Sequence, residues 1–223
     1  MGEWALGPGE ILWHFVQALA SGELLPHVGA SLLRSVPGFA LGAVLGVALG
    51  LLAGVSRVLD EMVSPVIFLT YPVPKIVLLP LIMVWLGIGD GSKVAIIALG
   101  CFYPAFIHAY YGARSTRTIL VWSALGMGAR QLAVFWKVVV PSAAPMLVAG
   151  LRVSLALSFI LLFAAEMVGS RSGLGYLIRQ AEGSLRFDLM YVSILTIAIL
   201  GYAGDTLVRL AGKRLLAWQA SVA

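Results

Sequence analysis

Residues 29–55 read GASLLRSVPGFALGAVLGVALGLLAGV, an apolar run in which glycine returns at every fourth position. The glycines that share this spacing are Gly38, Gly42, Gly46, Gly50 and Gly54. Positions four apart lie on one face of an α-helix, so the run predicts a helix with a flat glycine stripe. Such a stripe lets a second helix backbone approach closely in lipid. We expect that second helix to belong to the same chain, with an interface between subunits as the alternative.

The composition of the whole chain indicates a membrane protein. Of its 223 residues, 61% are hydrophobic and 11% are charged, whereas soluble domains are about 45–50% apolar and about 25% charged. A water-soluble fold of this size has too little interior to cover so much apolar surface. The net charge of +5 falls mostly between apolar segments. This distribution favours a role in membrane orientation and argues against nucleic-acid binding.

Five segments are long and apolar enough to cross a bilayer, which takes about 20 residues per helix. They run approximately over residues 29–55, 62–88, 93–112, 145–168 and 189–211. The stretch 10–21 is too short to span and predicts a helix that lies at the membrane interface. No tandem repeat or low-complexity linker is present, so we treat residues 1–223 as one domain. The predicted fold class is an all-α polytopic membrane protein.

The second span carries the prolines Pro72, Pro74 and Pro80. Proline removes a helical hydrogen bond and clashes with the preceding turn, so this span should be broken. Irregular backbone at membrane depth survives only where protein or a water-filled cavity covers it. We therefore consider these prolines candidates for a transport pathway, with a kink of no functional role as the alternative.

Basic residues in the loops predict the orientation of the chain. One side of the membrane would hold eight of them: Arg57, Arg114, Arg117, Arg130, Lys137, Arg209, Lys213 and Arg214. The other would hold four: Lys93, Arg171, Arg179 and Arg186. The side richer in Lys and Arg is cytoplasmic. We therefore expect a cytoplasmic C-terminus, an external N-terminus and a cytoplasmic loop at 113–144.

The loop 113–144 is unusually apolar for a solvent-exposed connection. Its residues Ser123, Ala124, Leu125, Gly126, Met127, Gly128, Ala129 and Arg130 include two glycines, and a helical run to Pro141 follows. The pattern predicts a helical hairpin that turns at Gly128 and ends at Pro141. An amphipathic hairpin suits docking into a groove on a partner protein. The alternative is an interfacial helix that lies on lipid headgroups.

The same loop resembles the signature of ABC importer permeases, which reads E-A-A, three residues, Gly, nine residues, then I-x-L-P. Gly128 matches the glycine, and Val138-Val139-Val140-Pro141 matches the ending with conservative changes. Trp122-Ser123-Ala124 stands where the family has E-A-A, so the glutamate is absent. The resemblance extends over about residues 8–212. It includes the stretches 72–81, 85–89, 165–169 and 172–178, which are similar to permeases for nitrate, sulfonates, taurine and bicarbonate.

This resemblance implies a five-transmembrane-helix type I ABC importer permease core with a cytoplasmic coupling-helix hairpin. It implies a multi-pass subunit of the bacterial inner membrane, paired with a second permease subunit, which we expect to be a second copy. Two cytoplasmic ATPase subunits would bind the hairpins and hold ATP and magnesium, so no cofactor is expected in this chain. A periplasmic or lipid-anchored binding protein would deliver a small anion such as nitrate, a sulfonate, bicarbonate or an aromatic acid. Residues 123–130 would dock the ATPase, and Pro141 would end the second helix of the hairpin.

Three charged residues within predicted spans are further candidates. Charges inside a membrane are costly and point to function by default. Glu166, at the outer end of its span, could line the pathway or pair with Arg171 or another nearby base. Asp205 could pair with Arg209, four residues further along the same helical face. Arg152 could reach the headgroups or face the pathway and attract an anion.

Other classes of function receive less support from the sequence. A self-sufficient secondary transporter or channel is the main alternative, but such transporters are commonly built from internal repeats, and none is visible. Cys101 lies in an apolar run and predicts a packed core residue. The histidines have no partners at ligand spacing, so no metal site is expected. No motif of an intramembrane enzyme is present, and the chain is expected to be a transport subunit.

Overall fold

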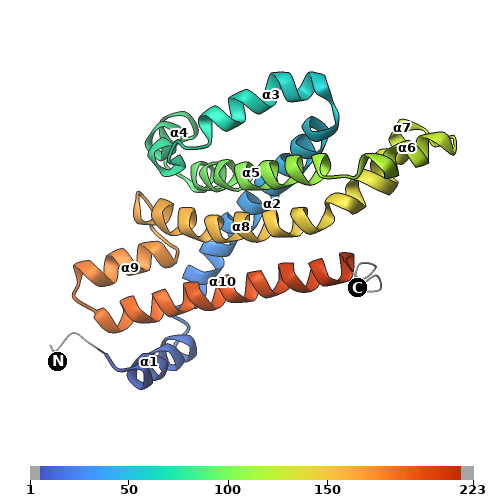
Figure 1. Cartoon of the computed structure of the whole chain (residues 1–223). Helices are drawn as coiled ribbons and strands as arrows, with labels where there is room; N and C mark the ends of the chain where they lie inside the picture. Colours follow the sequence, from blue (N-terminus) through green and yellow to red (C-terminus); the bar gives the residue numbers. More distant parts are fainter. Residues whose placement is uncertain (1–5, 217–223) are drawn as a thin grey trace.

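The computed structural model describes residues 6–216, and these form a helical protein without strands. Four long helices run across the molecule: α2 (Leu25–Val55), α5 (Asp90–Arg114), α8 (Val140–Met167) and α10 (Phe187–Leu215). All four are long and apolar enough to span a membrane, and a bent pair of shorter helices makes a fifth candidate span. Figure 1 shows α2, α5 and α8 in the middle of the bundle, with α3 and α4 on one side and α9, α10 and α1 on the other.

The glycine stripe of α2 faces α5 of the same chain. A Cβ atom added at Gly38 would lie 2.7 Å from Ile97 Cγ2, and one at Gly54 would lie 2.6 Å from Ala113 Cβ. At Gly46 the added atom would lie 2.5 Å from the backbone oxygen of Phe102. Gly42 and Gly50 face α5 in the same way. The two backbones therefore lie as close as they do because no side chain separates them.

Small residues also bring α8 against α5. A Cβ atom at Gly150 would lie 2.6 Å from His108 Cβ. Cys101 is fully buried, its thiol donates to the carbonyl of Ser154 (3.2 Å), and the Ser154 hydroxyl donates back to the carbonyl of Cys101 (2.9 Å). Cys101 is thus a packed core residue within the described part of the chain.

The predicted span 62–88 is two helices joined by a sharp bend. Helix α3 (Arg57–Thr70) is followed by a 3₁₀ turn, η1 (Lys75–Leu78), and by α4 (Leu79–Leu86). The two halves meet at 92°. The break at Pro72 and Pro74 follows from their missing donors, because the last carbonyls of α3 need other partners. Lys75 supplies them: its ammonium donates to the carbonyls of Thr70, Tyr71 and Val73 at 2.7–2.9 Å.

Two further helices, α1 and α9, lie at the end of the bundle opposite the hairpin and share one hydrophobic cluster (Figure 1). Helix α1 (Pro8–Ala20) is the short helix expected at the interface. Helix α9 (Leu174–Gly183) lies in a segment that the sequence analysis left as a loop, and it buries Leu174, Leu177 and Ala181 against the core. This helix has only ten residues, so a search for apolar segments long enough to span a membrane does not detect it.

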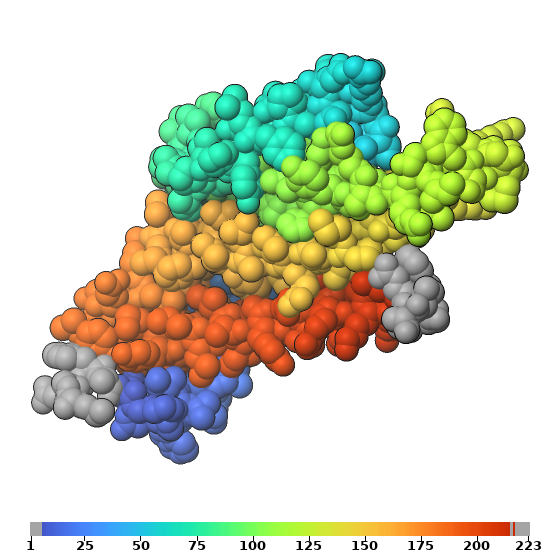
Figure 2. All heavy atoms as spheres, in the orientation of Figure 1, coloured from blue at the N-terminus to red at the C-terminus, as the bar shows by residue number. Residues whose placement is uncertain are grey.

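Large apolar side chains remain exposed along the sides of the bundle. They include Leu33, Leu41 and Val44 on α2 and Leu207 on α10. Surfaces of this kind suit the acyl chains of a bilayer. Figure 2 shows the remaining segment, residues 118–139, projecting beyond the end of the long helices. The C-terminal end of α10 lies at that same end, and the turn from α8 into α9 lies at the opposite end.

Candidate functional site: the α6–α7 hairpin and the charged groups of the bundle

The projecting segment is a hairpin of two short helices, α6 (Thr118–Gly126) and α7 (Gln131–Val134). The backbone closes α6 by a Schellman motif: Ala129 N–H donates to the Ala124 carbonyl (3.1 Å), and Gly128 N–H donates to the Leu125 carbonyl (2.9 Å). This motif requires a left-handed residue, and Gly128 has a φ of +81°. The sharp turn between the helices therefore depends on glycine at this position.

Large apolar side chains are exposed on this hairpin. Met127 at the turn is 82% exposed, and Trp122, Leu132 and Trp136 are each more than 60% exposed. Residues 113–144 contain the cations Arg114, Arg117, Arg130 and Lys137 and no carboxylate. An exposed apolar surface ringed by polar groups marks an interaction site. The hairpin is therefore suited chemically to a partner that offers an apolar groove and acidic residues.

Pro141 does not end the second helix of the hairpin, contrary to expectation. Helix α7 continues through a π-helical turn, η2 (Phe135–Val139), into α8, so that residues Gln131–Met167 form one helix of 37 residues. In the π turn, Val140 N–H donates to the Phe135 carbonyl, five residues back. Proline lacks a donor and crowds the previous turn, and a π turn relieves both problems locally. The hairpin is thus joined to the bundle by continuous helix.

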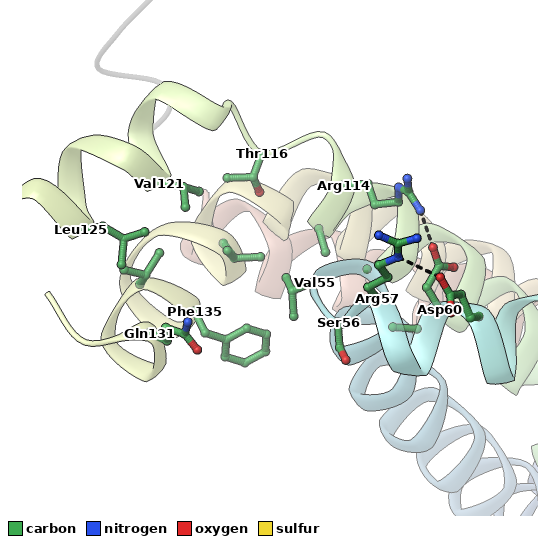
Figure 3. Close-up of a pocket in the computed structure, with 16 residues that line it drawn as sticks. Val55, Ser56, Arg57, Asp60, Arg114, Thr116, Val121, Leu125, Gln131 and Phe135 are labelled. Carbon is green, nitrogen blue, oxygen red and sulfur yellow. Dashed lines mark hydrogen bonds and ion pairs between the residues drawn. The ribbon is translucent and has the colours of Figure 1, made fainter.

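A cavity of about 750 Å³ lies at the base of the hairpin. Figure 3 shows it between the hairpin residues Val121 and Leu125 and the junction of α2 with α3, where Arg57, Asp60 and Arg114 are grouped on one side. Arg114 Nη1 lies 2.6 Å from Asp60 Oδ2, and Arg57 Nε lies 2.8 Å from Glu61 Oε1. The cavity therefore combines an apolar wall with a rim of two ion pairs.

A second group of charges is buried at the opposite end of the bundle, around Arg34 and Glu166. Glu166 is fully buried. Its carboxylate accepts from Arg34 Nη1 (2.7 Å), from the Ser31 hydroxyl (2.9 Å) and from Gly175 N–H (2.9 Å). Arg34 also donates to Asp90 Oδ1 (2.6 Å) at the start of α5. We call these residues the Arg34 cluster; it joins α2, α5, α8 and α9.

The Arg34 cluster changes the interpretation of Glu166. Its carboxylate is enclosed by atoms of its own chain, so it does not face a surface that a solute could reach, and its partner is Arg34 and not Arg171. Arg34 itself was missed as a site residue. The available signal was that it is the one charged residue in the run 29–55, and an isolated charge in a span points to a buried partner.

Arg152 and Asp205 form an ion pair between α8 and α10. Arg152 Nε lies 2.7 Å from Asp205 Oδ1, and Nη2 lies 3.1 Å from Oδ2, a two-point contact. Asp205 thus pairs with Arg152 across the helices, and not with Arg209 along its own helix. The two side chains are 48% and 35% exposed. A partly covered ion pair on two candidate spanning helices is stable beside water, lipid headgroups or another protein surface.

Three comparisons with known proteins agree with this architecture. Residues 46–217 match the family model described as the binding-protein-dependent transport system inner membrane component. The chain is 36% identical over 211 residues to the aliphatic sulfonates transport permease protein SsuC of Escherichia coli (strain K12), covering 95% of this chain and 80% of that protein. It is 32% identical over 206 residues to the taurine transport system permease protein TauC of the same organism, covering 92% and 77%.

The fold also matches a solved structure. A chain of the MetNI methionine ABC transporter in an inward-facing conformation superimposes with a TM-score of 0.68 and 22% sequence identity, covering 95% of this chain and 98% of that chain. At this identity the likeness concerns the fold, which is that of a type I importer permease. The family match covers most of the sequence, and two relatives exceed 30% identity over nearly its full length. The chain belongs to the family of inner-membrane components of binding-protein-dependent transport systems, and is a permease subunit of an ABC importer.

Proposed function

We propose that this permease imports a small anion of the sulfonate type, as part of a complex with a second copy of itself, two ATPase subunits and an external binding protein. The solute class is suggested by the relatives whose names specify aliphatic sulfonates and taurine, itself a sulfonate. The ATPase subunits hold the nucleotide and magnesium, and the binding protein supplies most of the selectivity. The complex lies in the bacterial inner membrane, with the N-terminus of this chain outside and its C-terminus in the cytoplasm.

One observation supports the ATPase assignment more than any other: the exposed apolar turn of the α6–α7 hairpin. The hairpin projects beyond the bundle (Figure 2), and its residues Met127 and Trp122 are 82% and 67% exposed among the described residues. Residues 123–130, with the left-handed Gly128 at their centre, would fill a groove on the ATPase surface. The cations beside them would pair with acidic residues at its rim.

The continuous helix that follows the hairpin suits a mechanical role. ATP binding would move the docked ATPases, and the helix Gln131–Met167 would carry that motion into the bundle without a flexible joint. Alternating access then needs two arrangements of the bundle whose balance is shifted by ATP and by the loaded binding protein.

The path itself would run beside the bend between α3 and α4. Pro72 and Pro74 lie in this bend, and Pro80 lies in the first turn of α4. Irregular backbone of this kind is typical of membrane regions that line a cavity. Arg152, partly exposed and paired with Asp205, is our candidate for the group that attracts the anion.

The docking proposal can be tested by mild-detergent purification of the tagged chain from its native membrane. Wild type should recover an ATPase subunit. Gly128→Val should reduce that recovery roughly tenfold or more, because a β-branched residue at a φ of +81° strains the turn that shapes the hairpin. Gly9→Val is the matched control, since Gly9 lies in α1, outside the hairpin, and is also in open space but has no left-handed φ.

Reconstitution separates the importer from its main alternative. In liposomes, the complete complex should accumulate a sulfonate such as taurine only when ATP, the ATPase and the binding protein are present. Equal recovery of the ATPase with both glycine variants would contradict the docking role of the hairpin. Solute movement by the purified chain alone, without ATP, would contradict the importer and establish a channel or secondary transporter.

A further inference from the structure

The cavity at the base of the α6–α7 hairpin has no assigned occupant. It opens where α2 ends at Val55 and α5 ends at Arg114, which is the level where two spans leave the membrane on the side expected to be cytoplasmic. Its volume of about 750 Å³ falls within the roughly 300–1,000 Å³ of typical small-molecule sites. The cavity therefore lies at the depth of the lipid headgroups on that side, next to the glycerol end of the acyl chains.

The lining of the cavity is divided between apolar and charged groups. Val121, Leu125 and Phe135 form much of the wall on the hairpin side, and Val55 closes the end of α2 (Figure 3). The rim beyond them carries the two ion pairs of α3 and α5. An occupant that contacts both the apolar wall and the charged rim must be amphiphilic, with an apolar portion and a charged headgroup.

The rim keeps unused hydrogen-bonding groups of both signs. Arg57 donates to Glu61 through Nε alone, so that its two terminal nitrogens have no acceptor among residues 6–216. Glu61 accepts through Oε1, which leaves Oε2 without a donor in the same part of the chain. Thr116, at the cavity wall, has a hydroxyl that lacks a hydrogen-bond partner within the described residues.

We infer that this cavity binds the headgroup of a phospholipid whose phosphate ester carries a primary ammonium. The free guanidinium nitrogens of Arg57 suit the phosphate, since guanidinium and phosphate form strong paired hydrogen bonds. The carboxylate of Glu61 suits the ammonium. The apolar wall receives the glycerol end of the acyl chains. The two arginines and two acids of the rim carry no net charge, which matches a zwitterion.

The same rim disfavours the other common headgroups. An anionic glycerol headgroup would bring its charge against Glu61 Oε2, which has no donor among residues 6–216. A quaternary choline ammonium has no N–H to give to Glu61 Oε2. The occupant also places lipid against the inner face of the docking hairpin, so that the hairpin rests partly on membrane and partly on its own chain.

The test uses the intact importer complex, purified with its ATPase and exchanged into nanodiscs of equal parts ethanolamine, choline and glycerol phospholipid. After transfer to detergent, native mass spectrometry counts the retained lipids of each class. Wild type should retain the ethanolamine lipid about tenfold over the other two, the change expected from one or two charge-assisted hydrogen bonds. Val121→Trp, which places an indole ring in the cavity, and Arg57→Gln, which removes the charged phosphate donor, should each abolish that preference.

Matched controls keep the result interpretable. Leu120→Trp places the same side chain at the neighbouring exposed position of α6, and Lys213→Gln removes an exposed cation of α10 that does not line the cavity. Both should retain the ethanolamine lipid as wild type does. Equal retention of all three lipids, a preference for the anionic one, or full retention by Val121→Trp and Arg57→Gln would each overturn the proposal.

Discussion

Glycine is required for different reasons in two regions of this protein. Along the contact between α2 and α5, glycines are required because an added side chain would meet the facing backbone; at Gly46 it would lie 2.5 Å from a carbonyl oxygen. At the tip of the hairpin, nothing lies within 4 Å of a Cβ added to Gly128, and glycine is required only because φ is +81°. The first set of glycines holds the bundle together. The second shapes the tip of the exposed hairpin, the surface that we propose docks the ATPase.

The largest effect should come from forcing the close contact apart. Gly46→Leu places a side chain into the backbone of α5. The loss of stability should exceed the roughly 1–3 kcal/mol of ordinary overpacking. We expect little folded protein, measured as the fraction that elutes as a single species in mild detergent. If Gly46→Leu folded and unfolded thermally like wild type, the backbones of α2 and α5 would not be in close contact at Gly46.

The next largest loss of stability should come from a change in the Arg34 cluster. Arg34→Met leaves Glu166 as a buried charge without its ion-pair partner, which costs about 3–5 kcal/mol in proteins generally. Thermal unfolding in detergent should show the loss, and the double change Arg34→Met with Glu166→Met should recover part of it. Arg57→Met is the control, because Arg57 is exposed and surface pairs contribute little. Equal losses from Arg34→Met and Arg57→Met would show that burial does not distinguish the two pairs.

Changes at the hairpin surface should separate binding from folding. Met127→Glu replaces an 82% exposed apolar side chain, and exposed substitutions change stability by only about 0.5 kcal/mol. We expect an unchanged unfolding temperature together with a clear loss of ATPase recovery. A drop in unfolding temperature without loss of the ATPase would show that the hairpin surface contributes to folding and does not bind the ATPase.

The smallest effect is a gain. Gly29 also lies in α2, but nothing lies within 4 Å of a Cβ added there. Gly29→Ala should stabilise the helix by about 0.5–1 kcal/mol, because alanine loses less backbone freedom on folding. A small rise in unfolding temperature is the expected result. Destabilisation would indicate that α2 uses its whole length for close packing, and not the stripe alone.

Local sequence patterns account for much of the fold. The four-residue spacing predicted the face of α2, and hydropathy indicated where the long helices lie, although the helix expected to begin at 145 is continuous from Gln131. Pro72 and Pro74 located the break between α3 and α4. These features depend on neighbours in sequence, and so they can be read without knowing the fold.

Contacts between distant residues could not be read in this way. Arg34 and Glu166 are 132 positions apart, and no spacing rule links them. Arg152 could have paired with several groups, and Asp205 had a plausible partner on its own helix. Pro141 was misread for a different reason: proline usually stops a helix, but here a π turn precedes it and α7 continues into α8.

The long helix that results has a geometric consequence. Its 37 residues measure about 55 Å at 1.5 Å per residue, whereas the hydrocarbon core is about 30 Å thick. Roughly 25 Å must therefore stand clear of the acyl chains, and the tip lies about 40 Å from the bilayer centre. If the helix pivots at the bilayer centre, a tilt of about 10° moves this end by about 7 Å. The movement that we propose a docked ATPase makes would then reach the closely packed backbones near the pivot as a smaller displacement.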